Sequence, residues 1–145
     1  MAIVYSTGYV NDNATPPVKH IPSDGGGRVR IYVDTYTQGA ADGSIGDIIR
    51  CKDLPAGARV LPGGMLSWGT GNATETLKAG VTGADAAFVA ATAAATAGKV
   101  ALDAFIAAGA AAYDITAATA VLITNATAAI KAGQKITITL PYVID

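Results

Sequence analysis

Few residues in this chain could carry out catalysis. The 145-residue sequence holds one histidine, His20, and one cysteine, Cys51. General acid–base and nucleophilic catalysis need such a group beside a second titratable side chain. His20 stands in a stretch bounded by prolines, and Ser44 lacks the Gly-x-Ser-x-Gly spacing of a nucleophile elbow because residue 42 is aspartate. The sequence therefore predicts that the protein is not an enzyme.

The sequence also lacks metal and cofactor motifs. The runs Asn11-Asp12-Asn13 and Asp42-Gly43-Ser44 do not complete the oxygen-ligand pattern of a calcium loop. The glycines at 25–27 match neither a P-loop nor a dinucleotide-binding fingerprint. A single cysteine excludes an internal disulfide framework and a zinc site built on several thiolates. We therefore expect no metal and no cofactor, and we expect Cys51 to be a small buried side chain in a protein made in a reducing cytosol.

The composition narrows the range of partners. Only 14% of the residues are charged, 51% are hydrophobic, and the formal net charge is -1. Without an excess of positive charge, no field attracts nucleic acid or an anionic membrane. The first six residues lack the basic and apolar regions of a secretory signal, and the alanine-rich stretches 86–97 and 104–122 are too weakly hydrophobic to span a bilayer. We therefore expect neither nucleic acid nor a membrane as a partner.

Short alternating segments predict that strands position the side chains of this protein. Val29, Ile31 and Val33 alternate with polar residues, which predicts a half-buried strand with these three on one face. Residues 134–144 alternate in the same way, and Pro141 places that strand at an edge or in a bulge because proline lacks a ladder donor. Further strands are predicted over residues 47–52, 58–61, 65–68, 74–79, 113–116 and 120–124.

The alanine-rich region from residue 84 to residue 132 contributes little regular helix to the prediction. Ala87, Phe88 and Ala91 lie at helical spacing after Asp85, which predicts one short helix from Asp85 to Ala91. Threonine and glycine interrupt any longer amphipathic pattern. Seven or eight short strands with one short helix predict a mainly β protein, a two-sheet β-sandwich, with the jelly roll as the preferred version.

The N-terminal segment differs from the rest of the chain. Residues 11–27 are rich in proline, glycine and polar side chains, so they cannot build a core. We expect residues 1–27 to form an extended N-terminal arm and residues 28–145 to form the β-sandwich domain. A disordered leader is the alternative interpretation. In the arm interpretation, apolar and aromatic side chains contact a neighbouring subunit: Ile3, Tyr5, Tyr9, Val18 and Ile21.

Two blocks of the sequence resemble virion structural proteins of tailed bacteriophages. The first is GDIIRCKDLPAGARVLPGGMLSW, from Gly46 to Trp68, followed by Thr76-Leu77-Lys78-Ala79-Gly80. The second runs from Tyr113 through the ending ITITLPYVID. These blocks consist of structural turns and strands, so the resemblance carries no catalytic residues. It implies a small β-sandwich that decorates or cements the virion capsid surface by binding the major capsid protein, after synthesis in the host cytoplasm.

The composition agrees with a subunit that is buried on several sides of an assembly. A surface that is poor in charge and rich in alanine, threonine and glycine suits close packing, and little charge opposes self-association. We therefore expect a homo-oligomer, with a trimer as the favoured state. Two alternatives stay open: a fibre, spike or tail-associated β module of the same virion, and a carbohydrate-binding module that stacks sugars on Trp68 and the tyrosines. Trp68 itself is expected to be a core residue.

Overall fold

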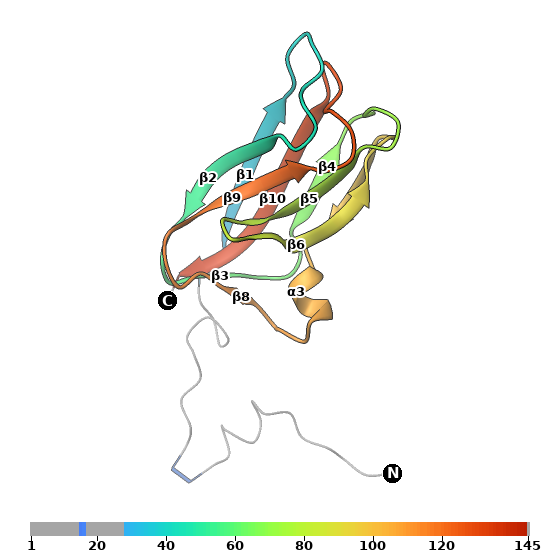
Figure 1. The fold of residues 1–145 in the computed structure, drawn as a ribbon. Coiled ribbons are helices and arrows are strands. Elements are labelled where there is room, and N and C mark those ends of the chain that lie inside the picture. The colour runs from blue at the N-terminus through green and yellow to red at the C-terminus, as the bar shows by residue number, and fades with distance from the viewer. Residues whose placement is uncertain (1–14, 17–27, 145) are drawn as a thin grey trace, which may run out of the picture.

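The computed structural model describes residues 15–16 and 28–144. Two antiparallel sheets pack face to face over this part of the chain (Figure 1). Apart from residues 15–16, the predicted arm lies outside the described residues, as do all five of its expected contact residues, Ile3, Tyr5, Tyr9, Val18 and Ile21.

The first sheet has six strands in the order β7-β4-β10-β3-β8, with β1 on the opposite side of β10. Its strands are β1 (Arg30–Thr37), β3 (Ala58–Val60), β4 (Met65–Trp68), β7 (Gly98–Ala101), β8 (Tyr113–Asp114) and β10 (Lys135–Ile144). The second sheet has four strands in the order β2-β9-β5-β6. Its strands are β2 (Ile48–Leu54), β5 (Thr76–Val81), β6 (Ala84–Ala93) and β9 (Thr119–Asn125). With the short helix α3 (Ala104–Ala107), this architecture confirms the predicted two-sheet β-sandwich.

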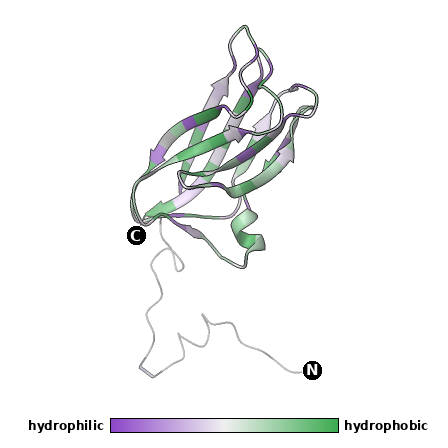
Figure 2. Cartoon of the chain, viewed as in Figure 1, coloured by the Kyte–Doolittle hydropathy of each residue, from purple (hydrophilic) through white to green (hydrophobic). Residues whose placement is uncertain are grey.

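The core lies between the two sheets and follows the alternation of the strands. On β10, the predicted alternation holds for Ile136, Ile138 and Leu140, which are fully buried, whereas beyond Pro141 the buried residue is Val143 and not Tyr142 or Ile144. From the second sheet, the Phe88 ring packs edge-on against Tyr113, with 5.4 Å between the ring centroids. Burial of each such large apolar side chain stabilises the fold by about 1.5–3 kcal/mol. Figure 2 shows the strands as mostly hydrophobic or neutral, with strongly hydrophilic residues in short stretches.

Trp68 is a core residue, which confirms that prediction. Its side chain is 8% exposed, and its indole Nε1 donates a hydrogen bond to the carbonyl oxygen of Thr96 at 2.9 Å. A buried indole needs such a partner because an unsatisfied donor is costly in the interior. Trp68 therefore has no free ring face on which a sugar could stack.

The helix predicted over Asp85–Ala91 is wrong, because that segment lies within β6. Strand β6 pairs with β5, and Gly83, at a φ of +85°, makes the tight turn between them. The pairing buries Phe88 and Val89 between the sheets. Alanine propensity for helix is small per residue, so this burial decides the local structure. The helix of the fold is α3, where Phe105 is the buried residue.

The strand predicted from Val29, Ile31 and Val33 exists as β1, but the prediction of its buried face is wrong. These three side chains are 54%, 69% and 60% exposed, whereas Tyr32 is 8% exposed. Tyr32 and Tyr36 bury more apolar area than the aliphatic residues would. The Tyr32 hydroxyl donates to the Asp34 carboxylate at 2.8 Å, so its polar tip is satisfied at the margin of the core.

Pro141 does not mark an edge strand, because β10 lies in the middle of its sheet and pairs on both sides. On one side, Pro141 stands opposite Ile31 of β1. On the other side, the partner of β10 changes at this point from β4, which ends its pairing at Thr139, to β3, which begins at Tyr142. The missing N–H therefore falls in a gap between two partner strands, where proline costs no ladder bond.

Candidate interaction surface

The outer face of the six-stranded sheet is broad and almost uncharged. The register aligns Val33, Thr139, Met65 and Ala101 in one row across four strands, because directly opposite residues share a face. The next row consists of Thr35, Thr137, Ser67 and Lys99, and Ile31 stands opposite Pro141. We call these ten residues the outer face. Lys99 is the one charged side chain among these ten, and Lys135 lies opposite Thr37 in the row beyond them. Val33, Met65 and Ile31 of the outer face are exposed to solvent.

A sheet face of this composition suits contact with another protein. Exposed aliphatic side chains that gather on one surface mark interaction sites more often than isolated ones do. The threonine hydroxyls of the second row add hydrogen bonding, since Thr35 Oγ1 and Thr137 Oγ1 lie 3.0 Å apart. Charged residues are depleted at the centres of protein interfaces, and the outer face has the same character.

One end of the sandwich is fixed by a polar network, with the exposed Asp42 at its margin and Glu75 and Asn125 buried, that joins three connecting loops. The Asp42 carboxylate accepts hydrogen bonds from the Asn72 side chain at 2.9 Å and from the Ala132 N–H at 2.8 Å. These bonds lower the pKa of Asp42, the Ala132 bond most strongly. Asn125 donates to the Ser44 and Ala128 carbonyl oxygens and ties the same loops together. The network keeps the loops rigid and contains no nucleophile.

Glu75 lies at the centre of this network and is fully buried. Its Oε2 accepts the Asn72 backbone N–H at 3.0 Å, while its Oε1 has no hydrogen-bond partner among the described residues. Burial raises the pKa of this carboxyl, and the negative charge of Asp42 adds to the rise. Among the described residues, however, no group of three histidine, cysteine, aspartate or glutamate side chains could hold a metal ion.

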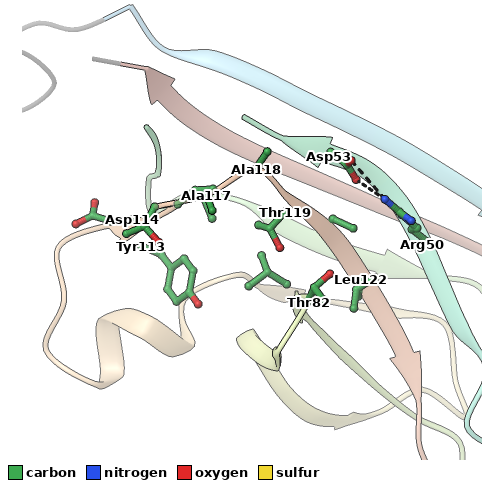
Figure 3. A pocket seen from close by; sticks show the side chains of 13 residues that line it. Arg50, Asp53, Thr82, Tyr113, Asp114, Ala117, Ala118, Thr119 and Leu122 are labelled. Carbon is green, nitrogen blue, oxygen red and sulfur yellow. Dashed lines mark hydrogen bonds and ion pairs between the residues drawn. The ribbon is translucent and has the colours of Figure 1, made fainter. Parts of the chain in front are cut away.

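An open groove of about 530 Å³ lies beside the loop that joins β8 to β9 (Figure 3). Its charged side chains are already paired: Arg50 with Asp53 at 3.1 Å, and Asp114 with Arg59 at 3.0 Å. Tyr113 packs with the aromatic rings of the core. Alanine and threonine form much of the remaining lining. The groove therefore presents no activated acid, base or nucleophile.

Cys51 is buried in the core, as the sequence predicted. Burial raises the pKa of its thiol to about 11, and the negative charge of Asp34 contributes to this rise. The thiol is therefore protonated at neutral pH and cannot act as a nucleophile. In the part of the chain that the structure describes, no helix is long and apolar enough to cross a bilayer.

The outer face was not found from the sequence, although part of its pattern was visible. The alternation in β10 had already placed Thr137 and Thr139 opposite the buried residues. The sequence predicts the aliphatic face of β1 as buried, because the alternating positions carry polar groups such as Arg30 and Asp34, although Tyr32 and Tyr36 on that face are also large apolar rings. A strand with apolar side chains on both faces can bury only one face in the core, so such a sequence pattern indicates that the other face is exposed and hydrophobic.

Comparison with known proteins finds similar solved structures, but no matching family model and no matching curated sequence. A chain from the capsid of Ralstonia phage GP4 is 25% identical, with a TM-score of 0.64, over 82% of this chain and 86% of that one. A chain from the cyanophage Pam1 capsid asymmetric unit is 21% identical, with a TM-score of 0.65, over 92% of this chain and 97% of that one. The structural neighbours of this β-sandwich are therefore phage capsid proteins.

Proposed function

We propose that the protein is a non-enzymatic structural component of a phage virion that decorates or cements the capsid by binding the major capsid protein. The observation that carries this proposal is the likeness to a chain of the phage GP4 capsid, which extends over 82% of this chain. The alignments cover 86% and 97% of the two matched chains, so those chains are similar in size to this one. A capsid subunit built as a single small sandwich fits attachment to a shell.

The outer face is the surface that we propose for contact with the capsid. It spans four strands, it carries Lys99 as its one charge, and its exposed aliphatic residues would be removed from water by a neighbouring protein. Each copy needs to contribute only a few kcal/mol of binding energy, because copies linked through a shell gain from multivalency. The role of the protein is then mechanical: it holds adjacent shell subunits against the pressure of packaged DNA.

The finer expectations from the sequence belong to this proposal. Residues 28–145 act as one sandwich domain on the capsid surface, and residues 1–27 act as an arm whose apolar side chains bind a neighbouring subunit. Synthesis takes place in the host cytoplasm, and copies associate with one another, with a trimer as the proposed state. The strand orders β1-β10-β4-β7 and β2-β9-β5-β6 support the jelly-roll version of the sandwich, because the chain passes repeatedly from one sheet to the other.

The proposal is tested with phage particles prepared with and without this protein. Purified protein should bind shells that lack it, and these decorated particles should retain DNA better than bare particles when they are heated. A Met65→Lys variant, which places a second charge on the outer face, should bind the shells more weakly, whereas Ile106→Lys on the exposed side of α3 should bind normally. Equal DNA loss from both kinds of particle would contradict the cement role.

A second set of variants tests the arm within the full-length chain. Replacing Tyr5 and Tyr9 together by serine should leave the circular dichroism spectrum unchanged and weaken shell binding. If the variant binds as tightly as the original protein, the arm makes no contact with the shell. Electron microscopy of the particle distinguishes the alternatives, because localisation solely to the tail would favour a fibre, spike or tail-associated module.

A further inference from the structure

The free edge of β1 differs from the other edges of the two described sheets. Natural edge strands are protected by bulges, short length, proline or charge, since an open edge invites pairing with another chain. Strands β2 and β6 have register shifts in their pairing, and β7 and β8 are four and two residues long. Strand β1 pairs with β10 over eight consecutive residues without a shift and contains no proline. Of the protecting devices it has only charge, in Arg30 and Asp34, so its edge is open to a partner that pairs these charges.

The hydrogen bonds between β1 and β10 show which backbone N–H and C=O groups of β1 point toward its open edge. The Gln38 N–H donates to the Gln134 carbonyl oxygen at 2.9 Å, in register with the pairing of β1 and β10. Bonded and non-bonded pairs alternate along an antiparallel ladder, so the even-numbered residues of β1 bond to β10. The N–H and C=O groups of Ile31 and Val33 therefore point away from β10, toward the open edge.

The side chains on the same residues are apolar and exposed. Ile31 is 69% exposed and Val33 is 60% exposed, and both lie on the outer face. On the inner side, Arg30 is exposed and Asp34 lies four residues further along the strand. The strand thus carries an aliphatic row on one face and opposite charges on the other, placed on either side of Tyr32.

We propose that β1 pairs antiparallel with β1 of a second copy of this chain, about a two-fold axis that passes through Tyr32. In this register Ile31 stands opposite Val33 of the other copy, at positions whose free N–H and C=O groups can exchange both ladder bonds. Arg30 stands opposite Asp34 of the other copy, and the symmetry repeats this pair. The six-stranded sheets of the two copies then form one continuous sheet.

A cavity of about 350 Å³ beside β1 supports this choice of occupant. It is lined by Asp34 and Asp53, together with Tyr32, Leu54 and other residues next to the edge. Asp53 is paired with Arg50, and Asp34 accepts the Tyr32 hydroxyl and the Thr35 N–H, so a cation from a second copy would add to these bonds and would not fill a vacant site. Arg30 of the second copy would extend toward this position, so the same strand supplies both the acidic site and the cation that fits it. A two-fold contact of this kind requires no shell and goes beyond attachment to the capsid.

The full-length protein, in the absence of any shell, tests this contact by light scattering or sedimentation. The mass should be an even multiple of 14.4 kDa, that of a dimer or, where the proposed trimer also forms, of a hexamer in which two-fold contacts join two trimers. Val33→Lys should raise the dissociation constant by about 100-fold or more and halve the mass, because it places an unpaired cation in the contact twice. Ile48→Lys is the matched control, because Ile48 is 60% exposed on β2, an edge strand of the second sheet. This variant should leave the mass unchanged. A protein that stays monomeric at tens of micromolar, or an oligomer that Val33→Lys leaves intact, overturns the proposal.

Cysteine cross-linking tests the register. Directly opposite residues in a bonded pair lie about 5.5 Å apart between Cα atoms, a distance that a disulfide can span. A mixture of Ile31→Cys and Val33→Cys proteins should form a disulfide-linked dimer of the two variants, whereas Ile31→Cys alone should not. Cross-linking of Ile31→Cys alone would contradict the two-fold axis at Tyr32.

Hydrogen exchange distinguishes a second copy from the other occupants of the edge. In the assembled protein, the backbone N–H groups of Ile31 and Val33 should be protected from exchange. In the Val33→Lys variant, the Ile31 N–H should lose this protection. Protection that persists at monomer concentrations would mean that a segment of the same chain covers the edge, and this result would overturn the proposal. Failure of shell binding would leave these results unaffected, so the two proposals can fail separately.

Discussion

Replacing Glu75 by glutamine should stabilise the protein at neutral pH. Glu75 is the only glutamate of the chain, and it is fully buried in the network that joins the loops. Glutamine has the same shape and keeps an oxygen to accept the Asn72 N–H. The substitution removes the buried negative charge and the repulsion from Asp42 that together raise the pKa of this carboxyl.

The direction of the pH dependence follows from this raised pKa. The folded protein holds the Glu75 proton more tightly than the unfolded chain, in which the pKa is near the ordinary value of 4.5. The contribution of Glu75 to stability is therefore greatest below this value and is lost as the pH rises through the folded pKa. The Glu75→Gln variant does not undergo this loss, so its advantage over the original protein should grow between pH 4 and pH 7.

Glu75 Oε1 has no hydrogen-bond partner among the described residues, and glutamine would place its NH2 group there without a partner as well. The gain therefore comes from removing the buried charge, because an unsatisfied buried group costs about 1–3 kcal/mol when it is neutral and more than this when it is charged. For a chain of this size, 1 kcal/mol shifts the melting temperature by about 3 °C, so Glu75→Gln should raise it by about 3–9 °C at pH 7. At pH 4, where the carboxyl is protonated in both states, the two proteins should melt close together.

Thermal unfolding followed by circular dichroism at several pH values from 4 to 8 measures this effect. Asp103→Asn is the control for loss of one negative charge, because Asp103 is exposed and its side chain makes no cap hydrogen bond to α3. The control should leave the melting temperature nearly unchanged at every pH. The reasoning would be refuted if Glu75→Gln melted at or below the original protein at pH 7, or if the difference were the same at all pH values.

Three further predictions concern the core and its margins. Gly71→Ala should lower the free energy of unfolding, measured by urea titration, by about 1–3 kcal/mol. The reason is that its Cβ would lie 2.6 Å from the Ala94 carbonyl oxygen and would also clash with Glu75. Gly39→Ala is the control and should have little effect, because there is open space around Gly39. Phe88→Ala should cost about 3–5 kcal/mol in urea unfolding, since the ring is fully buried between the sheets, and a loss below 1 kcal/mol would contradict the described core. Cys51 should resist alkylation by iodoacetamide at pH 7.5 in the folded protein, because burial raises the pKa of its thiol to about 11. The same thiol should react rapidly in denaturant. Rapid reaction in the folded state would show that the thiol is accessible and would contradict this prediction.

Much of the fold could be predicted from the sequence, because local alternation controls where strands form. The period of two in residues 134–144 identified a strand and its buried residues Ile136, Ile138 and Leu140, but not its place in the middle of the sheet, since Pro141 had indicated an edge or a bulge. The turn residues on either side of the short strands separated them, and the small number of titratable groups pointed away from catalysis. These conclusions depend on residue type and spacing within one segment, which are available without knowledge of the partners of that segment.

The tertiary structure decided the questions in which one segment depends on another. The segment 85–91 has the composition of a helix, but it is a strand because pairing with β5 buries Phe88 and Val89. Strand β1 has two apolar faces, and only its packing against the core buries Tyr32 and leaves Ile31 exposed. The outer face likewise exists only because the register aligns residues from four strands that are far apart in the chain. Burial and register are properties of pairs of segments, so the local pattern of one strand cannot determine them.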